Sequence, residues 1–190
     1  MNGGLMGSMM GMMFEGGQET KDTGIAFDQS QTLGQIKDDG LNSEYFAIID
    51  TWNKTFGFKT GSATNDVRKE ITGDIAIWFD GIVTNTTDAV LSGLEILTGS
   101  GFDAIKEQVL SSTLNVGNIS TKDMDMEQTE EALAGVFSAS ADKLVADYFP
   151  IMQNFQQVGE GMFETLVRVA SGVEQAQVSL AQFGFAAIDF

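Results

Sequence analysis

The chain contains no histidine and no cysteine among its 190 residues, and its single proline is Pro150. Without imidazole and thiol groups, it has no histidine base, no thiolate nucleophile, no disulfide and none of the usual zinc ligands. An enzyme made from this sequence would depend on paired carboxylates, a serine and lysine pair or a carboxylate-bound hard cation. We therefore expect no enzymatic activity, no cofactor and no metal.

Positive charge is also scarce, since 10 Lys and Arg stand against 27 Asp and Glu, for a net charge of −17. Such a surface repels bare phosphate and anionic lipid head groups. We expect no specific nucleic-acid binding. Apolar residues make up 43% of the chain, enough for the core of about one domain.

The first residues form a biased segment. Residues 3–14 read GGLMGSMMGMMF, in which Gly3, Gly7 and Gly11 recur every fourth position. On a helix these glycines would form a row that permits close approach of another helix. The alternative is a flexible tail. Twelve residues fall short of the roughly twenty that span a bilayer, and no basic stretch precedes them as in a signal peptide. Residues 15–22 are polar and predict a linker.

The next part predicts mixed secondary structure. Residues 24–29 suit a short extended segment, and residues 32–39 suit a short helix closed by Gly40. Residues 45–58, YFAIIDTWNKTFGF, predict a β-hairpin. A three-residue loop, 53–55, would pair Trp52 with Phe56 and bring the apolar residues to one face. That face comprises Phe46, Ile48, Trp52, Phe56 and Phe58. Either its own core or another chain would cover it.

Helical spacing follows. Residues 66–98 predict either one bent helix or two short helices separated at the polar run 84–88. Asn65 or Asp66 could cap its start, and the glycines at 99–101 would end it. Its apolar face begins with Ile71, Ile75, Trp78, Phe79 and Ile82. Residues 102–110 predict another helix, and residues 113–119 a strand or extended connector.

Two helices are predicted near the C-terminal end. Asp125 and Gln128 have the spacing of a capping box, and Pro150 stops the helix that they begin. This helix has one consistent face, formed by Leu133, Val136, Phe137, Ser140, Leu144 and Tyr148. From residue 159 to about 181, a set of mainly apolar positions follows steps of three and four, which is heptad spacing. They are Phe163, Leu166, Ala170, Val173, Gln177 and Leu180. Met162, Val169, Ala176 and Phe183 broaden the stripe. This helix packs either on its own domain or on another chain.

Two constellations could carry chemistry but fit it poorly. Asp123, Asp125 and Glu127 alternate along the chain as cation ligands do. The glycine and the glutamate that complete a calcium-binding loop are missing, however. The start of a helix, where the macrodipole favours acidic side chains, accounts for the same acids. Ser140 and Lys143 have Ser-x-x-Lys spacing, and a Lys-Thr-Gly tripeptide occurs at 59–61. The tripeptide precedes the serine, and the Ser-Asp-Asn companion is absent. Neither constellation predicts a catalytic residue.

The predicted architecture is α+β and mainly helical, with one β-hairpin packed on helices and a C-terminal helical hairpin around Pro150. We divide the chain into a Gly/Met-rich tail and linker (1–22), an α+β domain (23–125) and a C-terminal helical region (126–190). The candidate interaction residues are Trp52, Phe56, Phe58, Phe163, Leu166, Ala170, Val173 and Leu180.

One segment carries a family resemblance. VGEGMFETLVRVASGVEQA, residues 158–176, resembles a stretch toward the C-terminal part of tail tape-measure proteins of long-tailed bacteriophages and prophages. Residues 41–58 and 130–150 are similar in character. The resemblance implies a structural protein of the virion tail, made in the bacterial cytoplasm and placed near the tail tip. It implies homo-oligomers and other tail proteins as partners: tube, distal tail or hub proteins and assembly chaperones. It implies no catalytic residue.

Tape-measure proteins are typically far longer, so the resemblance further implies a fragment or a short, split relative, and leaves open whether this part measures tail length. Two alternatives remain. Residues 1–14 could enter a membrane beside neighbouring helices and help genome passage. A carboxylate-dependent hydrolase acting on cell wall is the other, since any 27 acids offer a pair at some spacing.

Overall fold

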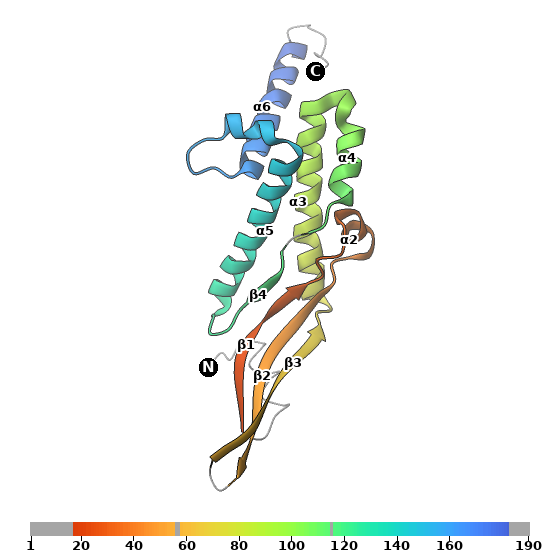
Figure 1. Ribbon diagram of the computed structural model, residues 1–190. Coiled ribbons are helices and arrows are strands. Elements are labelled where there is room, and N and C mark those ends of the chain that lie inside the picture. Colours follow the sequence, from red (N-terminus) through yellow and green to blue (C-terminus); the bar gives the residue numbers. More distant parts are fainter. Residues whose placement is uncertain (1–16, 56–57, 115, 183–190) are drawn as a thin grey trace.

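The computed structural model describes residues 17–55, 58–114 and 116–182, without the side chains of residues 53–55, 58–60 and 180–182. Within these residues, four antiparallel strands form one sheet and most of the remainder is helical. The predicted α+β class is confirmed. Figure 1 shows an elongated molecule, with the sheet at one end and the helices stacked beyond it.

The sheet has the strand order β3-β2-β1-β4. Its strands are β1 (Gln18–Phe27), β2 (Ser43–Thr55), β3 (Phe58–Glu70) and β4 (Asn118–Ser120). Because β1 begins at Gln18, residues 18–22 belong to the sheet, and the linker predicted for them is wrong. The sheet therefore includes a central strand, β1, whose first half is polar. A search for alternating apolar residues does not detect such a strand.

The predicted β-hairpin exists, but its two strands remain paired further along the chain than predicted. Trp52 pairs with Ser62, and the ladder continues to Thr55 opposite Phe58. The predicted three-residue loop and the pairing of Trp52 with Phe56 are therefore wrong. The polar residues 53–55 extend the strand instead of ending it, and residues 56–57, between β2 and β3 in the sequence, lie outside the described part.

Gly24 permits the closest backbone approach in the sheet. A Cβ built there would lie 2.0 Å from the Ile119 carbonyl oxygen and 2.7 Å from the ring of Phe46. Gly24 is the register partner of Phe46 on β2 and of Ser120 on β4. The buried Phe46 ring thus lies across a residue without a side chain, and β4 depends on that glycine for its pairing.

The first helices combine confirmed and corrected predictions. Helix α2 (Leu33–Asp39) has the predicted extent, capped by Thr32 and closed by Gly40. Helix α3 (Asp74–Thr98) begins after Gly73, so the predicted start at 66 and its cap are wrong. Residues 66–70 instead pair with β2.

Helix α3 is continuous through residues 84–88, where an interruption was considered. Thr87 is buried, and its hydroxyl donates to the Val83 carbonyl at 2.8 Å within the helix. The polar side chain is thereby satisfied without breaking the helix. Gly99 ends α3 as predicted, with a short 3₁₀ turn η1 (Gly99–Gly101) after it.

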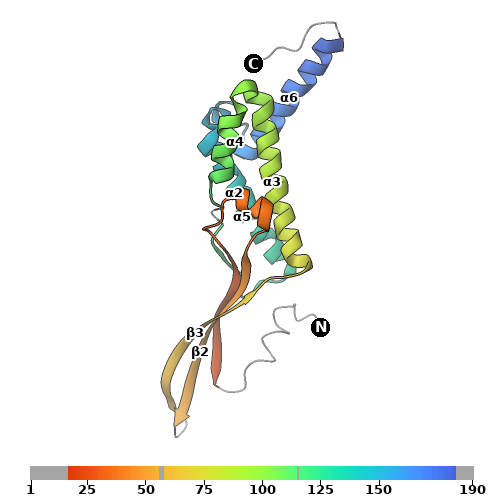
Figure 2. The ribbon, with the colours of Figure 1, turned by 90° about the vertical axis from the view of Figure 1, so that its right-hand side faces the viewer.

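The remaining helices are α4 (Phe102–Ser111), α5 (Met126–Tyr148) and α6 (Met162–Gln182), with the 3₁₀ helix η2 (Pro150–Phe155) between the last two. The capping box of Asp125 and Gln128 is confirmed. Helix α5 ends just before Pro150, as predicted. Helices α5 and α6 pack against each other, but both run in the same direction, and α6 continues past the end of α5 (Figures 1 and 2). They do not fold back as an antiparallel pair.

Three aromatic rings join the sheet to the helices. Phe27 of β1 lies edge-on to Phe79 of α3 and Phe137 of α5, with ring centroids 5.2 and 5.5 Å apart. All three side chains are buried. Edge-to-face geometry adds about 0.5–1.5 kcal/mol per pair beyond the burial of area. This cluster fixes the end of β1 on the helical part.

Candidate interaction surfaces

The candidate residue Trp52 lies on β2 and is half-buried. Its backbone N–H donates to the carbonyl of Gly17 at 3.0 Å, and a Cβ at Gly17 would lie 2.7 Å from its indole nitrogen. Trp52 therefore packs against the chain entering β1. Phe56 lies outside the described residues. Phe58 begins β3, and its side chain is not described.

The candidate residues at the start of α6 pack within the chain. Leu166 and Ala170 are buried, and the Leu166 side chain lies directly on Gly93 of α3. Phe163 is half-buried against the same core. These contacts use the first half of the heptad stripe, so Leu166 and Ala170 do not reach the surface.

The second half of α6 extends beyond the ends of α3 and α4 (Figures 1 and 2). Val173 is half-buried, whereas Ala176 is exposed and Val178 is 54% exposed. Leu180 lies in this half of the helix, and its side chain is not described. An apolar stripe that begins in the core thus continues onto a projecting helix.

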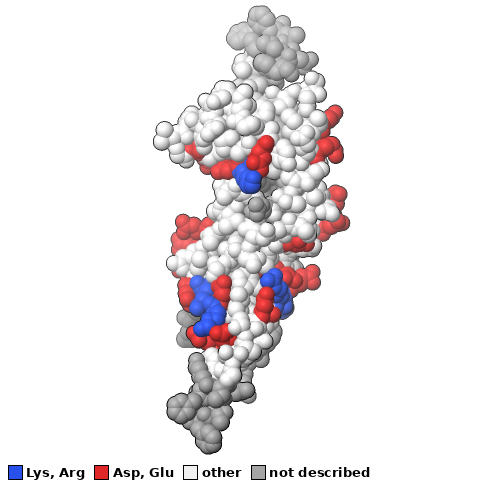
Figure 3. All heavy atoms as spheres, in the orientation of Figure 1, with Lys and Arg blue, Asp and Glu red and all other residues white. Residues whose placement is uncertain are grey.

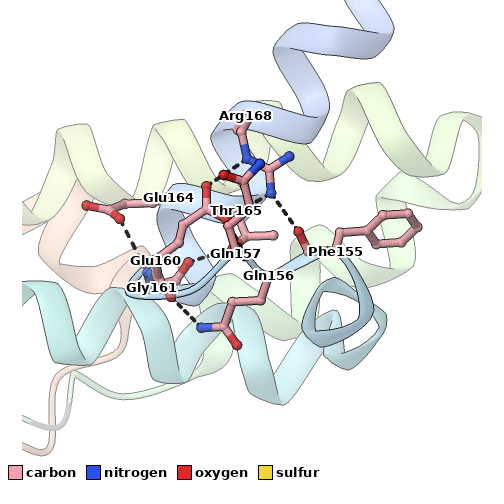
Figure 4. Close-up of polar contacts among 8 residues, drawn as sticks. All are labelled: Phe155, Gln156, Gln157, Glu160, Gly161, Glu164, Thr165 and Arg168. Carbon is pink, nitrogen blue, oxygen red and sulfur yellow. Dashed lines mark hydrogen bonds and ion pairs between the residues drawn. The ribbon is translucent and has the colours of Figure 1, made fainter.

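A polar cluster fixes the loop between η2 and α6 (Figure 4). The Arg168 guanidinium donates to both carboxylate oxygens of Glu160, at 2.7 and 2.8 Å, and to the Phe155 carbonyl at 2.6 Å. Glu160 also accepts from the Thr165 hydroxyl at 2.9 Å and the Gln157 N–H at 3.0 Å. Four hydrogen-bond donors thus converge on the Glu160 carboxylate. The two from Arg168 form a bidentate, charge-assisted pair.

These contacts lower the pKa of Glu160 from 4.5 to about 2, chiefly through the hydrogen bonds from Arg168 and then from the Gln157 N–H. The same pairing raises the pKa of Arg168. A second carboxylate, Asp142 of α5, accepts from the Phe163 N–H at 2.8 Å. The start of α6 is therefore held at two points, and the loop before it has a defined shape.

The 3₁₀ helix η2 and that loop present apolar side chains to solvent. Ile151 and Phe155 are about half exposed, at 52% and 51%, and Val158 is fully exposed. Residues 148–159 contain no charged residue in a chain of net charge −17. An uncharged, fixed segment with exposed apolar side chains on an acidic protein is typical of a contact surface. Our sequence reasoning missed it, although the gap in the charge pattern was a usable signal.

Helix α3 exposes a second apolar pair at its start. Ile77 is 68% exposed and Trp78 is 48% exposed. The Trp78 ring also lies 5.2 Å from the ring of buried Phe79. Trp78 and Phe79 were both predicted to lie on the core face, but only Phe79 is buried there, and Trp78 is half exposed.

One cavity of about 60 Å³ lies among α2, α3, α5 and the segment after α4. Ser140 and Lys143, the pair with Ser-x-x-Lys spacing, contribute to its lining. The Lys143 ammonium, however, donates to Asp147 at 2.6 Å, one turn further along α5. The space is about that of a few water molecules, and the Lys-Thr-Gly tripeptide lies away from it, on β3.

The charged side chains on the face drawn in Figure 3 are mostly acidic. Figure 3 shows them over both the sheet and the helical parts, with each visible Lys or Arg beside an acid. Within the described ranges, no three acidic residues converge as metal ligands do. No helix in that part of the chain combines the length and apolar character needed to cross a membrane.

In comparisons with known proteins, no family model, no curated protein and no solved structure matches the chain.

Proposed function

We propose that this chain is a structural component of the tail of a long-tailed bacteriophage or prophage. It would be a tape-measure segment near the tail tip that acts in tail assembly and genome delivery. The observation that carries the proposal is the resemblance of residues 158–176 to tape-measure proteins. This segment includes the Glu160–Arg168 pair and the part of α6 that packs on Gly93, so the resembling residues are also those that position α6.

The distribution of exposed apolar side chains supports an assembled protein. Ile151 and Phe155 lie on η2 and Val158 lies on the loop that Arg168 fixes, while Val178 lies on the projecting half of α6. Fixing exposed apolar groups in water has no benefit for a monomer, whereas a neighbouring subunit that covers them recovers roughly 25 cal/mol per Å² of apolar area. A tail protein has such neighbours.

Charge supports the same role. A net charge of −17 keeps a protein beside a genome from adhering to DNA through its surface. A component that must separate from DNA at ejection benefits from this repulsion.

The proposal is tested by deleting residues 158–176 in frame from the gene in its phage or prophage and examining lysates by electron microscopy. We expect tailless heads or tails of abnormal structure. A matched control is the exposed substitution Glu174→Ala, which should leave tails intact. Normal, infectious particles from the deletion would contradict the proposal.

A further inference from the structure

Strand β3 forms one edge of the sheet. The strand order β3-β2-β1-β4 gives it β2 as its one neighbour among the described strands, and Figure 1 shows it on the side of the sheet away from β1. Residues 61–70 are exposed apart from Val67, which is half-buried. A long, exposed edge strand presents unpaired backbone groups to which another strand can hydrogen-bond.

The register shows which backbone groups of β3 point away from β2. Antiparallel partners alternate between pairs that exchange two backbone hydrogen bonds and pairs that exchange none. The Ile71 N–H donates to the Ser43 carbonyl at 2.9 Å. This bond lies one position beyond the pair of Glu70 with Glu44, so those two residues exchange none. The even-numbered residues from 64 to 70 therefore direct their N–H and C=O groups to the outer edge.

Two of these outward-directed residues carry opposite charges. The Arg68 guanidinium donates to the Asp66 carboxylate at 3.0 Å, and its other nitrogen lies 3.5 Å from Glu44 of β2. All three side chains are nearly half exposed. Exposed ion pairs contribute little to stability, so Asp66 and Arg68 are available to charged groups of a strand that pairs with β3.

The sequence of residues 64–70, TNDVRKE, is complementary to itself when the second copy runs in the opposite direction. With Val67 opposite Val67 of a second copy, Asp66 lies opposite Arg68 and Arg68 opposite Asp66. The other positions in this register combine a hydrogen-bond donor with an acceptor: Thr64 with Glu70, and Asn65 with Lys69. Opposite charges at facing positions stabilise an antiparallel pair.

Neighbouring registers lose this complementarity. Residues with outward-directed backbone groups must face each other, so a twofold axis moves along β3 in steps of one residue. An axis at Asp66 places that carboxylate opposite its own copy, and an axis at Arg68 does the same with the guanidinium. Like charges at facing positions destabilise the pair. Charge therefore favours the axis at Val67 over both neighbouring registers.

We propose that β3 of one molecule pairs antiparallel with β3 of a second copy of this chain, across a twofold axis at Val67. The two four-stranded sheets become one continuous sheet, and the contact closes as a dimer because both copies use the same residues. An unrelated extended peptide would also find backbone partners at this edge, but the self-complementary charges of residues 64–70 favour a second copy. The inference does not depend on the assignment to a phage tail.

The test is sedimentation of the purified full chain and of two charge variants, with folding verified by circular dichroism. We expect the wild type to form a dimer. Arg68→Asp places two carboxylates at each charged position of the contact, and Asp66→Arg places two guanidinium groups there. Each should weaken dimerisation about tenfold or more. An equimolar mixture of the two variants restores opposite charges and should form a heterodimer, which no loss of folding can imitate.

The matched control is Lys143→Asp on α5. It makes the same change of charge as Arg68→Asp and also removes an exposed ion pair, the one with Asp147. Dimerisation should be unchanged in this variant. A monomeric wild type, a dimer that persists in both single variants, or a mixture that remains monomeric overturns the proposal.

Amide hydrogen exchange of the wild type, followed by NMR at low and high protein concentration, tests the backbone pairing itself. The Arg68 N–H points to the outer edge and should gain protection as the dimer forms. The Val67 N–H points to β2 and should be protected at both concentrations. A dimer in which the Arg68 N–H exchanges as fast as in the monomer overturns the pairing of the two strands.

Discussion

Leu166 of α6 packs directly on Gly93 of α3. A Cβ built on Gly93 would lie 2.9 Å from Cγ of Leu166, whose side chain is completely buried. The two helices therefore approach at a residue that has no side chain, and α3 and α6 owe their spacing to it.

Gly93→Ala should destabilise the protein by about 1–3 kcal/mol through overpacking, despite a gain in helix propensity of up to about 1 kcal/mol. Gly81→Ala is the matched control in the same helix, because a Cβ there meets nothing within 4 Å. It should be neutral or stabilising. Urea unfolding measures both.

The double variant Gly93→Ala with Leu166→Ala tests whether the pair interacts directly. Leu166→Ala alone should cost about 2–5 kcal/mol. The double variant should be clearly more stable than the sum of the single losses, because the new methyl group occupies vacated space. Strict additivity would show that the two residues do not share a contact.

Gly24→Ala should cost more than about 3 kcal/mol, because its Cβ would lie 2.0 Å from the backbone oxygen of Ile119. Adding Phe46→Leu frees space on the side of the ring but leaves the backbone clash. We therefore expect no more than partial recovery in thermal unfolding. Full recovery would mean that β4 is free to move away.

Glu160→Gln should lower the melting temperature at pH 7, because it removes the charge that Arg168 and Thr165 stabilise. Hydrogen bonds from Arg168 lower the folded-state pKa of Glu160 from 4.5 to about 2. Its contribution to stability is therefore full above pH 4.5 and is lost as the pH falls toward 2.

The difference between wild type and Glu160→Gln should accordingly shrink across that pH range. Melting curves from pH 7 to pH 2 follow it, with Glu174→Ala on α6 as a control that lacks this network. A difference that stays constant down to pH 2 would contradict the lowered pKa.

Asp125→Ala should destabilise by about 1 kcal/mol, because the Asp125 carboxylate accepts from the Gln128 N–H at 2.9 Å and caps α5. Asp125→Asn keeps an accepting oxygen and should retain most of the stability. Guanidinium unfolding compares the two. Equal losses would show that charge near the helix start matters more than the cap.

Local signals predicted α2 and the start of α5 correctly, because a cap is decided by residues three apart. The start of α3 was missed for the opposite reason. Residues 59–70 are polar apart from Ala63 and Val67, and they form a strand because β2 offers a partner along its whole length. Pairing of this kind depends on the register between two strands, which composition does not carry.

The candidate interaction residues show the same difference between what local patterns predict and what contacts between distant residues decide. The heptad spacing identified Leu166 and Ala170 as one face, but periodicity does not name the partner of a face. The structure assigns both to contacts within the chain. Ile151, Phe155 and Val158 were missed although they are four and three residues apart, because they lie between Pro150, where one helix was predicted to stop, and residue 159, where the next was predicted to begin. Their exposure follows from the contacts of Arg168 with Glu160 and Phe155, which join residues up to 13 apart.

Quantitative mass spectrometry of purified tails is the most direct test of the central proposal, that neighbouring tail proteins cover these apolar surfaces. We predict peptides of this chain at a fixed ratio to the tube protein, with residues 150–160 protected from surface labelling in the particle and labelled in the isolated chain. Absence of the chain from intact tails, or equal labelling in both states, would contradict the account.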